Sequence, residues 1–392
     1  VLEGTLLDKK NGVPIVYATV GVEGTSIGSI TNQAGEFRLH LADSLRRKSL
    51  VFSHVGYVAQ KIDIPLLTAG QHFTLTLEPR IFPLQEVVIR VVHPIRLMRE
   101  MLEKRMINYS QKPVYFTTFY REGVQYKQKF RSLTEAVFKI YKSPVQSLYA
   151  REQVKLLKMS RITDGLEQDT LIARMSGGID ACLQLDIINH LPDFLLADAH
   201  KDVYAYTSAD VTIVGDHLVN VISFEQKKEV KEPLYCGELY IDSDNGALLQ
   251  AQIRIHPRYM KQATDMVVQR QARRMKIVLQ ELTYTISYKP WNGTYYINHV
   301  RGDLHFKVKQ KRQWLGSSSL HTWFEMVTCK IDTVGVTRFQ RNERIPTRTV
   351  FADTHFKYDS DFWENFNVIP WEKQLVEVIE QLTSKIEKIE YE

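Results

Sequence analysis

The chain of 392 residues lacks most of the sequence patterns that mark an enzyme or a metalloprotein. It contains neither a P-loop nor a GxGxxG pattern, so it offers no loop for nucleotide phosphates. Its 12 histidines occur without HxH, HxxE or HExxH spacing, so no metal site can be assembled from residues that are neighbours in sequence. We therefore predict no catalytic residue, no metal site and no cofactor.

Cysteine is scarce, and long apolar runs are absent. The three cysteines, Cys182, Cys236 and Cys329, are odd in number and far apart, which argues against a disulfide framework and predicts buried free thiols. The best apolar runs, such as "VPIVYATVGV", have the length of a strand. We therefore predict no transmembrane span.

The net charge of +6, from 51 basic and 45 acidic residues, is mild for this length, but the basic residues are clustered. The two clusters comprise Arg254, Arg258, Lys261, Arg270, Arg273, Arg274 and Lys276, and then Lys307, Lys309, Lys311 and Arg312. A groove for nucleic acid would have aromatic residues between these charges and a known docking motif, and the sequence has neither. We predict no nucleic-acid partner, and instead a solvated face or a face resting near anionic lipid headgroups.

Strand patterns fill the first quarter of the chain. Phe37, Leu39 and Leu41 alternate with polar residues, which is the period of a strand with one dry and one wet face. Turn signals recur every eight to twelve residues or so, the spacing of a small sandwich. Gly35 is the expected left-handed residue of one such turn. Because the chain is longer than one core usually grows, we predict two domains, 1–92 and 93–392.

The first domain resembles a known family. The stretches "GTLLDKKNGVPIVYATVGVEGTSIGSITNQAGEFRLHL", "LVFSHVGYVAQKIDI" and "LQEVVIR" are similar in order to the carboxypeptidase-regulatory-like domain. This transthyretin-like β-sandwich begins many exported proteins of Gram-negative bacteria. The resemblance implies a module without catalytic residues of its own, in a protein of the periplasm or the outer-membrane surface.

The second domain is mostly strands, with Asn245-Gly246 and Asn292-Gly293 as hairpin turns. Helical patterns occur at 94–107, near 180–200, near 258–276 and in a terminal helix, 371–391. "NYSQKPVYFTTFYREGV" followed by "LTEAVFKIYK" resembles a region of uncharacterised exported bacterial proteins, and the meander of strands looks like the half-open barrel of lipoprotein carriers. The predicted fold class is therefore mainly β, α+β: a sandwich plus a large twisted antiparallel sheet, half-barrel-like, with packed helices.

The most suggestive polar patch is "FYRE". In a strand, Tyr120 and Glu122 share one face while Phe119 and Arg121 share the other. Arg121 either forms a structural ion pair with a carboxylate such as Glu135 or lines a ligand cavity. The ligand-binding candidates are therefore Tyr120, Arg121, Glu122 and Glu135.

Two further motifs have simpler interpretations. "DSDNG" at 242–246 resembles the start of a calcium loop, but Ile253 stands where the loop needs a glutamate, so we predict a hairpin turn. Arg301-Gly302-Asp303 has the sequence of an adhesion tripeptide, and we predict a simple bend between two strands.

Three functions remain open from sequence alone. The first is a non-catalytic exported cell-envelope protein that binds a protein, glycan or lipidic partner. The alternative is a carrier of lipophilic cargo, with the aromatic residues of the second domain around an apolar cavity of several hundred Å3. The third is a hydrolase with dispersed catalytic residues, which requires a histidine and a carboxylate or nucleophile within hydrogen-bonding reach in one cleft.

Overall fold

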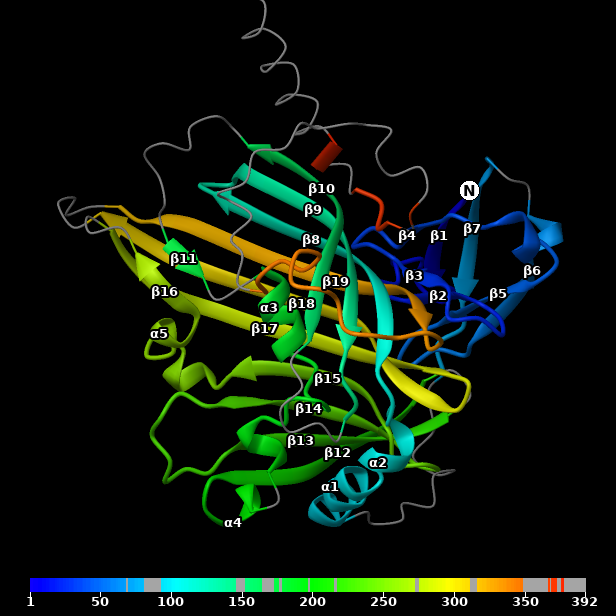
Figure 1. Cartoon of the computed structure of the whole chain (residues 1–392). Coiled ribbons are helices and arrows are strands. Elements are labelled where there is room, and N and C mark those ends of the chain that lie inside the picture. The colour runs from blue at the N-terminus through cyan, green and yellow to red at the C-terminus, as the bar shows by residue number, and fades with distance from the viewer. Residues whose placement is uncertain are drawn as a thin grey trace, which may run out of the picture.

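The computed structural model contains a small β-sandwich packed beside a ten-stranded antiparallel sheet (Figure 1). The residues that it describes are 1–67, 70–80, 93–145, 152–163, 173–175, 178–196, 198–214, 217–271, 275–310, 316–347, 366, 368–371 and 375–376. The predicted fold class, mainly β and α+β, is confirmed.

The sandwich consists of a three-stranded and a four-stranded sheet. The first is β4 (Glu36–Leu39), β1 (Leu2–Asp8) and β7 (His72–Leu77), and the second is β3 (Gly28–Ile30), β2 (Thr19–Val22), β5 (Ser49–Ser53) and β6 (Gln60–Asp63), with short 3-10 helices at Asp43–Leu45 and Ile64–Leu66. Phe37 and Leu39 face a common core with Leu6 and Phe52, as their alternation predicts. Gly35 has φ +75°, which confirms its left-handed turn.

In the large sheet, β8 and β19, its first and last strands in the chain, pair with each other two strands in from one edge. Its spatial order is β10 (Gln153–Thr163), β9 (Lys129–Lys142), β8 (Val114–Tyr126), β19 (Ser318–Asp332), β18 (Thr294–Gln310), β17 (Met275–Trp291), β15 (Leu248–Ile255), β14 (Tyr235–Asp242), β13 (His217–Gln226) and β12 (Tyr204–Val214). The chain therefore runs outward from β8 to one edge, crosses the sheet to the other edge at β12, and returns strand by strand to β19.

Helices are short and lie around the sheet. They are α1 (Pro94–Glu103), α2 (Arg105–Asn108), α3 (Gly178–Gln184), α4 (Ala199–Asp202) and α5 (Thr264–Val267), with 3-10 turns at Asp193–Leu195 and Pro257–Tyr259. The helix predicted at 94–107 is confirmed, and helical structure near 180–200 is present. None of the helices in the described parts of the chain is long and apolar enough to cross a membrane.

The helix predicted near 258–276 is wrong. Among the described residues of this stretch, only the end of the 3-10 turn Pro257–Tyr259 and α5 are helical, and β16 (Val268–Gln271) pairs with β11 (Ala173–Met175). Sheet pairing outweighs the helical periodicity from Val268 onward, because a β-branched residue such as Val268 loses side-chain freedom in a helix.

The two faces of the large sheet have different covers. One, the helix-covered face, carries Tyr120 and Phe138 and packs against Ile179, Cys182 and Phe194 of the segment that crosses from β10 to β12. Figure 1 shows α3 of this segment in front of the central strands. The other, the sandwich-covered face, carries Phe119 and Arg121, so the predicted alternation of "FYRE" is confirmed.

The sandwich shares a core with the sheet. Ile30 packs in one apolar cluster with Phe119, Val137 and Val327. Ser26 contributes polar contacts, because its Oγ donates to the carbonyl of Ile331 at 2.9 Å and accepts from the amide of the same residue at 3.0 Å. The two units are therefore joined by a packed interface.

Arg301-Gly302-Asp303 does not form the predicted bend. It lies within β18, where Gly302 is paired with Phe324 of β19. A Cβ atom on Gly302 would stand 2.4 Å from the Cζ atom of Phe324, so the aromatic ring uses the space above the glycine. Arg301 is buried, which removes it from any adhesion partner.

Two sequence-based predictions, a domain boundary and a terminal helix, concern residues that the structure does not describe. The segment 81–92, which precedes the predicted boundary at 92/93, is not among them. The predicted terminal helix, 371–391, has only 371 and 375–376 among them. The domain boundary and the terminal helix therefore stay predictions.

Candidate functional site

A half-open pocket lies where the end of β9 meets β17, β18 and the segment after α3. Its cavity is about 20 Å3, which holds about one water molecule. The lining residues are Tyr109, Ser110, Val114, Phe116, Lys142, Ser143, Val145, Asp186, Ile188, Asn189, Tyr288, Tyr295, Tyr296 and Ile297. Aromatic walls with a few converging polar groups are typical of a binding site.

Buried charges stand at the base of this pocket. The Nζ atom of Lys142 lies 2.7 Å from Glu152 Oε1 and 2.8 Å from Asp186 Oδ2. The hydroxyl of Tyr288 donates to the other oxygen of Asp186 at 2.9 Å, and His190 Nε2 lies 3.0 Å from Glu152 Oε1. One cation and two carboxylates therefore form a compact network.

Three members of the network, Lys142, Glu152 and Tyr288, have shifted pKa values that favour one charge state each. Burial alone would lower the pKa of Lys142, but Asp186 and Glu152 outweigh burial and raise it. Burial alone would raise the pKa of Glu152, but Lys142 and His190 outweigh burial and lower it. Burial raises the pKa of Tyr288 well above its ordinary value. Because general acids and bases work best with a pKa near the ambient pH, these three groups are poorly suited to proton transfer.

The hydroxyl of Ser143 is the polar group of the pocket with unused hydrogen-bonding capacity among the described residues. Ser143 is buried, and its Oγ has no hydrogen-bond partner among the residues that the structure describes. Buried hydroxyls are normally satisfied by protein, water or ligand. Ser143 can therefore donate to, or accept from, a polar group that enters the cavity.

The predicted pair Arg121 and Glu135 lies elsewhere, on the sandwich-covered face. Arg121 Nε is 2.7 Å from Glu135 Oε1, and Arg121 also donates to the backbone carbonyl of Ile369. The indole nitrogen of Trp371 donates to the same Glu135 oxygen at 2.7 Å. Arg121 is 1% exposed, so its surroundings in this structure are protein.

A second buried arginine extends this cluster toward the sandwich. Arg301 lies 3.3 Å from Glu325, and Glu325 lies 3.7 Å from Arg121. Arg301 also donates a hydrogen bond to Asp303 at 2.6 Å. The ring of Tyr17, from the sandwich, lies 5.4 Å from the Arg301 guanidinium. These charges therefore connect the two units of the protein.

The other two predicted residues, Tyr120 and Glu122, lie on the helix-covered face. The Tyr120 hydroxyl donates to Glu122 at 2.7 Å. Burial raises the pKa of Glu122, although hydrogen bonds from Tyr120 and Thr134 act in the opposite direction. The four sequence-predicted residues thus form two pairs on opposite faces, and no single site unites them.

Replacing Glu122 by glutamine tests its protonation. Because the pKa of Glu122 is raised in the folded state, its protonation stabilises the folded protein at pH values below the ordinary pKa of 4.5. This stabilisation is lost as the pH rises through the pKa of the folded state. Glu122→Gln keeps the hydrogen bonds of the protonated acid, so its free energy of unfolding at pH 7 should lie within about 1 kcal/mol of wild type or above it. Between pH 4.5 and neutral pH, the variant should show a flatter stability profile in denaturant titrations.

Glu135→Gln is the matched control for that measurement. It removes the charge that faces Arg121 and should cost about 3 kcal/mol or more at pH 7. Equal losses for the two variants would show that Glu122 is ionised and paired, contrary to the expectation.

Two further sequence patterns have structural explanations. "GTSIG" at 24–28 has the GxSxG spacing of a nucleophile elbow, which sequence reasoning overlooked, but it joins β2 to β3 instead of a strand to a helix. The hydroxyl of its serine, Ser26, is occupied by the backbone of Ile331. No nucleophile is therefore presented at this turn.

The predicted hairpin turn at 242–246 joins β14 to β15. One Asp242 oxygen accepts from the amides of Asp244 and Asn245, and the other lies 2.9 Å from His217 Nδ1. His217, Asp242 and Asp244 have ligand atoms within 4.8 Å of one another, but these contacts already use both Asp242 oxygens. These contacts of the turn account for the carboxylate of Asp242.

Comparison with known proteins identifies the N-terminal unit. Residues 2–89 match the model of the CarboxypepD_reg-like domain family, which confirms the predicted module. No curated protein matches the chain. The match covers less than a quarter of the chain and leaves the large sheet unassigned.

Among solved structures, the chain is similar to a protein described as an outer membrane lipoprotein-sorting domain from Vibrio parahaemolyticus. The identity is 10% and the TM-score 0.26, over 64% of this chain and 94% of that one. It is also similar to a DUF1329 family protein from Desulfovibrio piger, at 10% identity and a TM-score of 0.27, over 63% of this chain and 96% of that one. Similarities this distant carry no argument about what the chain binds.

Proposed function

We propose that the chain is a non-catalytic exported protein of the cell envelope that binds a partner at the pocket beside Lys142. The observation that carries this proposal is the buried hydroxyl of Ser143, which has no hydrogen-bond partner among the described residues, in a half-open cavity of about 20 Å3. A cavity of this size accepts one small polar group, such as a sugar hydroxyl or the tip of a peptide side chain. The partner is therefore a protein or a glycan larger than the pocket, held mainly at its rim.

The fixed charges favour binding over hydrolysis. Lys142 stays protonated and Glu152 stays ionised because each stabilises the other. A hydrolase needs a nucleophile or base that changes its protonation state during the reaction. Charges that do not change state instead orient polar groups of a bound partner.

Close packing favours docking over carriage of lipophilic cargo. Where α3 and the following segment lie on the helix-covered face, Ile179, Cys182, Leu183 and Phe194 fill the space against the sheet. A carrier needs an apolar cavity of roughly 300 Å3 or more for one ligand. Carriage of lipid is therefore the second candidate.

Export is supported by the N-terminal unit. Residues 2–89 match a domain that, by the resemblance described above, begins many exported proteins of Gram-negative bacteria. The periplasm or the outer-membrane surface is the proposed location. The sandwich then acts as a spacer that presents the large sheet to its partner.

Native mass spectrometry of the full chain purified from an envelope fraction tests the proposal. Asn189, a partly exposed residue of the pocket wall, is replaced by tryptophan to block the cavity, and Gln184→Trp on exposed α3 surface is the control. We expect a polar partner on the wild type and on Gln184→Trp, with at least a tenfold loss on Asn189→Trp. A lipid adduct that persists on Asn189→Trp would favour carriage, and equal partner binding by all three would contradict docking at the pocket.

A further inference from the structure

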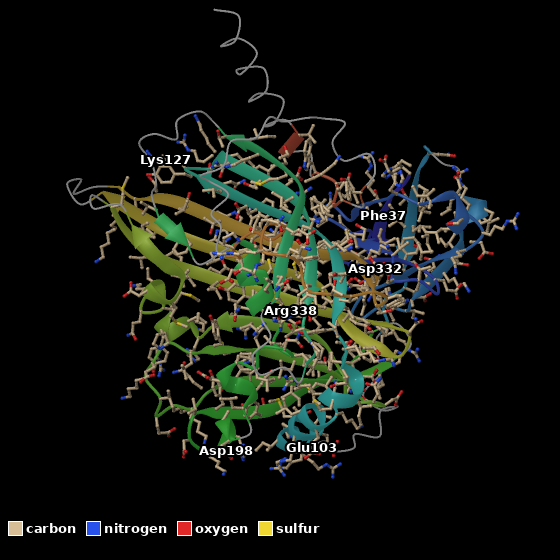
Figure 2. The ribbon with its side chains drawn as sticks, viewed as in Figure 1. Phe37, Glu103, Lys127, Asp198, Asp332 and Arg338 are labelled. Carbon is tan, nitrogen blue, oxygen red and sulfur yellow. The ribbon has the colours of Figure 1, made fainter. Side chains whose placement is uncertain are left out.

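Five exposed lysines gather where β8 and β18 end and β9 and β17 begin. They are Lys127, Lys129, Lys276, Lys307 and Lys309, and we call this region the lysine end. Figure 2 shows Lys127 at the end of the sheet remote from Phe37 of the sandwich. The sandwich therefore does not cover this surface.

Strand register brings the lysines together. Lys276 and Lys309 are directly opposite each other on β17 and β18, and Lys307 is opposite Ser319 of β19. The amide of Lys127 donates to the carbonyl of Ser319 at 3.0 Å. Strands β9, β17 and β18 and the β8–β9 turn therefore present positive charge at one place.

The arrangement is unfavourable for the isolated protein. Like charges directly opposite on neighbouring strands repel each other. None of the five lysines has an ion-pair partner among the residues that the structure describes, whereas other exposed lysines, such as Lys9 and Lys61, do. An anionic partner would relieve the repulsion.

The chemistry of the surface favours lipid headgroups over an acidic protein. Protein interfaces are depleted in lysine and are anchored by aromatic residues, methionine or arginine. The five exposed charges are lysines, which act as flexible point charges instead of bidentate forks. Arg131 of β9, at the same end, is half-buried and lies 5.8 Å from the centre of the Tyr126 ring. Clusters of four to eight basic residues are the pattern that binds anionic membrane surfaces.

We propose that the lysine end docks on the phosphate-bearing headgroups of an anionic membrane surface. The attraction is electrostatic and requires no insertion of the protein into the bilayer. This inference goes beyond the proposed docking at the pocket, which uses a different part of the sheet.

Flotation with vesicles tests the inference. The full chain is mixed with vesicles of phosphatidylglycerol and phosphatidylcholine or of phosphatidylcholine alone, at low and at high salt. We expect binding to the anionic vesicles only, and release at high salt, because exposed charges are screened. The triple variant Lys276→Gln, Lys307→Gln, Lys309→Gln should bind about 100-fold more weakly, since each lysine near such a surface contributes about fivefold.

A second triple variant separates position from net charge. Lys10→Gln, Arg47→Gln, Lys112→Gln removes the same charge from exposed residues on the sandwich and at the opposite end of β8, and it should bind within about threefold of wild type. Equal weakening by both triple variants, or wild-type binding to neutral vesicles, would overturn the inference. Asn189→Trp should leave vesicle binding unchanged, so failure of the pocket proposal would be recognised separately.

Discussion

Replacing Arg121 by methionine should lower the free energy of unfolding by about 3–5 kcal/mol, the usual result of removing one partner from a buried ion pair. The variant would leave Glu135 buried with only the indole of Trp371 as a donor among these contacts. It would also remove the donor to the Ile369 carbonyl. Chemical denaturation at pH 7 measures the loss.

Two variants make this prediction specific. Arg38→Met removes the cation from an exposed pair with Glu3 and should change the stability by less than about 1 kcal/mol. Arg121→Met combined with Glu135→Leu should be more stable than Arg121→Met alone, because the unpaired charge is gone. If the double variant is no better than the single one, the loss comes from packing instead of charge.

Replacing Lys142 by methionine should cost a similar amount, about 3–5 kcal/mol at pH 7. Glu152 and Asp186 are both buried, and each lies within 2.8 Å of the lysine nitrogen that the variant lacks. The stability that the lowered pKa of Glu152 provides is present above its ordinary value of 4.5 and is lost as pH falls through the folded value. The gap between wild type and variant should therefore shrink below pH 4.5.

Lys155→Met is the control. Lys155 also pairs with a glutamate at 2.7 Å, but the pair is about one-third exposed, and its loss should cost less than about 1 kcal/mol. Thermal melts at pH 4 and pH 7 compare the two variants. A loss for Lys142→Met that does not change between these pH values would contradict the charged network.

Alternation along β8 could be predicted because a strand has a fixed period of two. The sequence therefore predicts that Tyr120 and Glu122 lie on the opposite face of the strand from Arg121, and the structure has them there. Arg121 and Glu135 are also directly opposite each other in the β8–β9 hairpin, a register that local pairing can supply. Local rules thus identified this pair.

The turn of that hairpin could not be predicted. Lys127 and Gln128 have φ values of +52° and +63°, in the left-handed region that glycine and asparagine favour. Nothing in the side chains of lysine or glutamine signals this conformation. The long ladders of β8 and β9 and their packing determine it, which is information that the turn sequence does not carry.

The pocket beside Lys142 was missed for a related reason. Its charged and phenolic groups come from β9, the segment after α3 and β17, so Lys142, Asp186 and Tyr288 are separated by many intervening residues. Only the topology, in which the chain crosses the sheet between β10 and β12, brings them together. No spacing rule connects positions so far apart.

The core that Ile30 shares with Phe119, Val137 and Val327 has a mechanical consequence. A pull on the sandwich acts directly on β8 and β19, the pair that joins the first and last strands of the large sheet. The interface between the sandwich and the large sheet is stiff, because packed side chains resist displacement more than a flexible linker does. Tension applied at the N-terminal unit would therefore be transmitted to strands inside the sheet, and the molecule would bear load as one body.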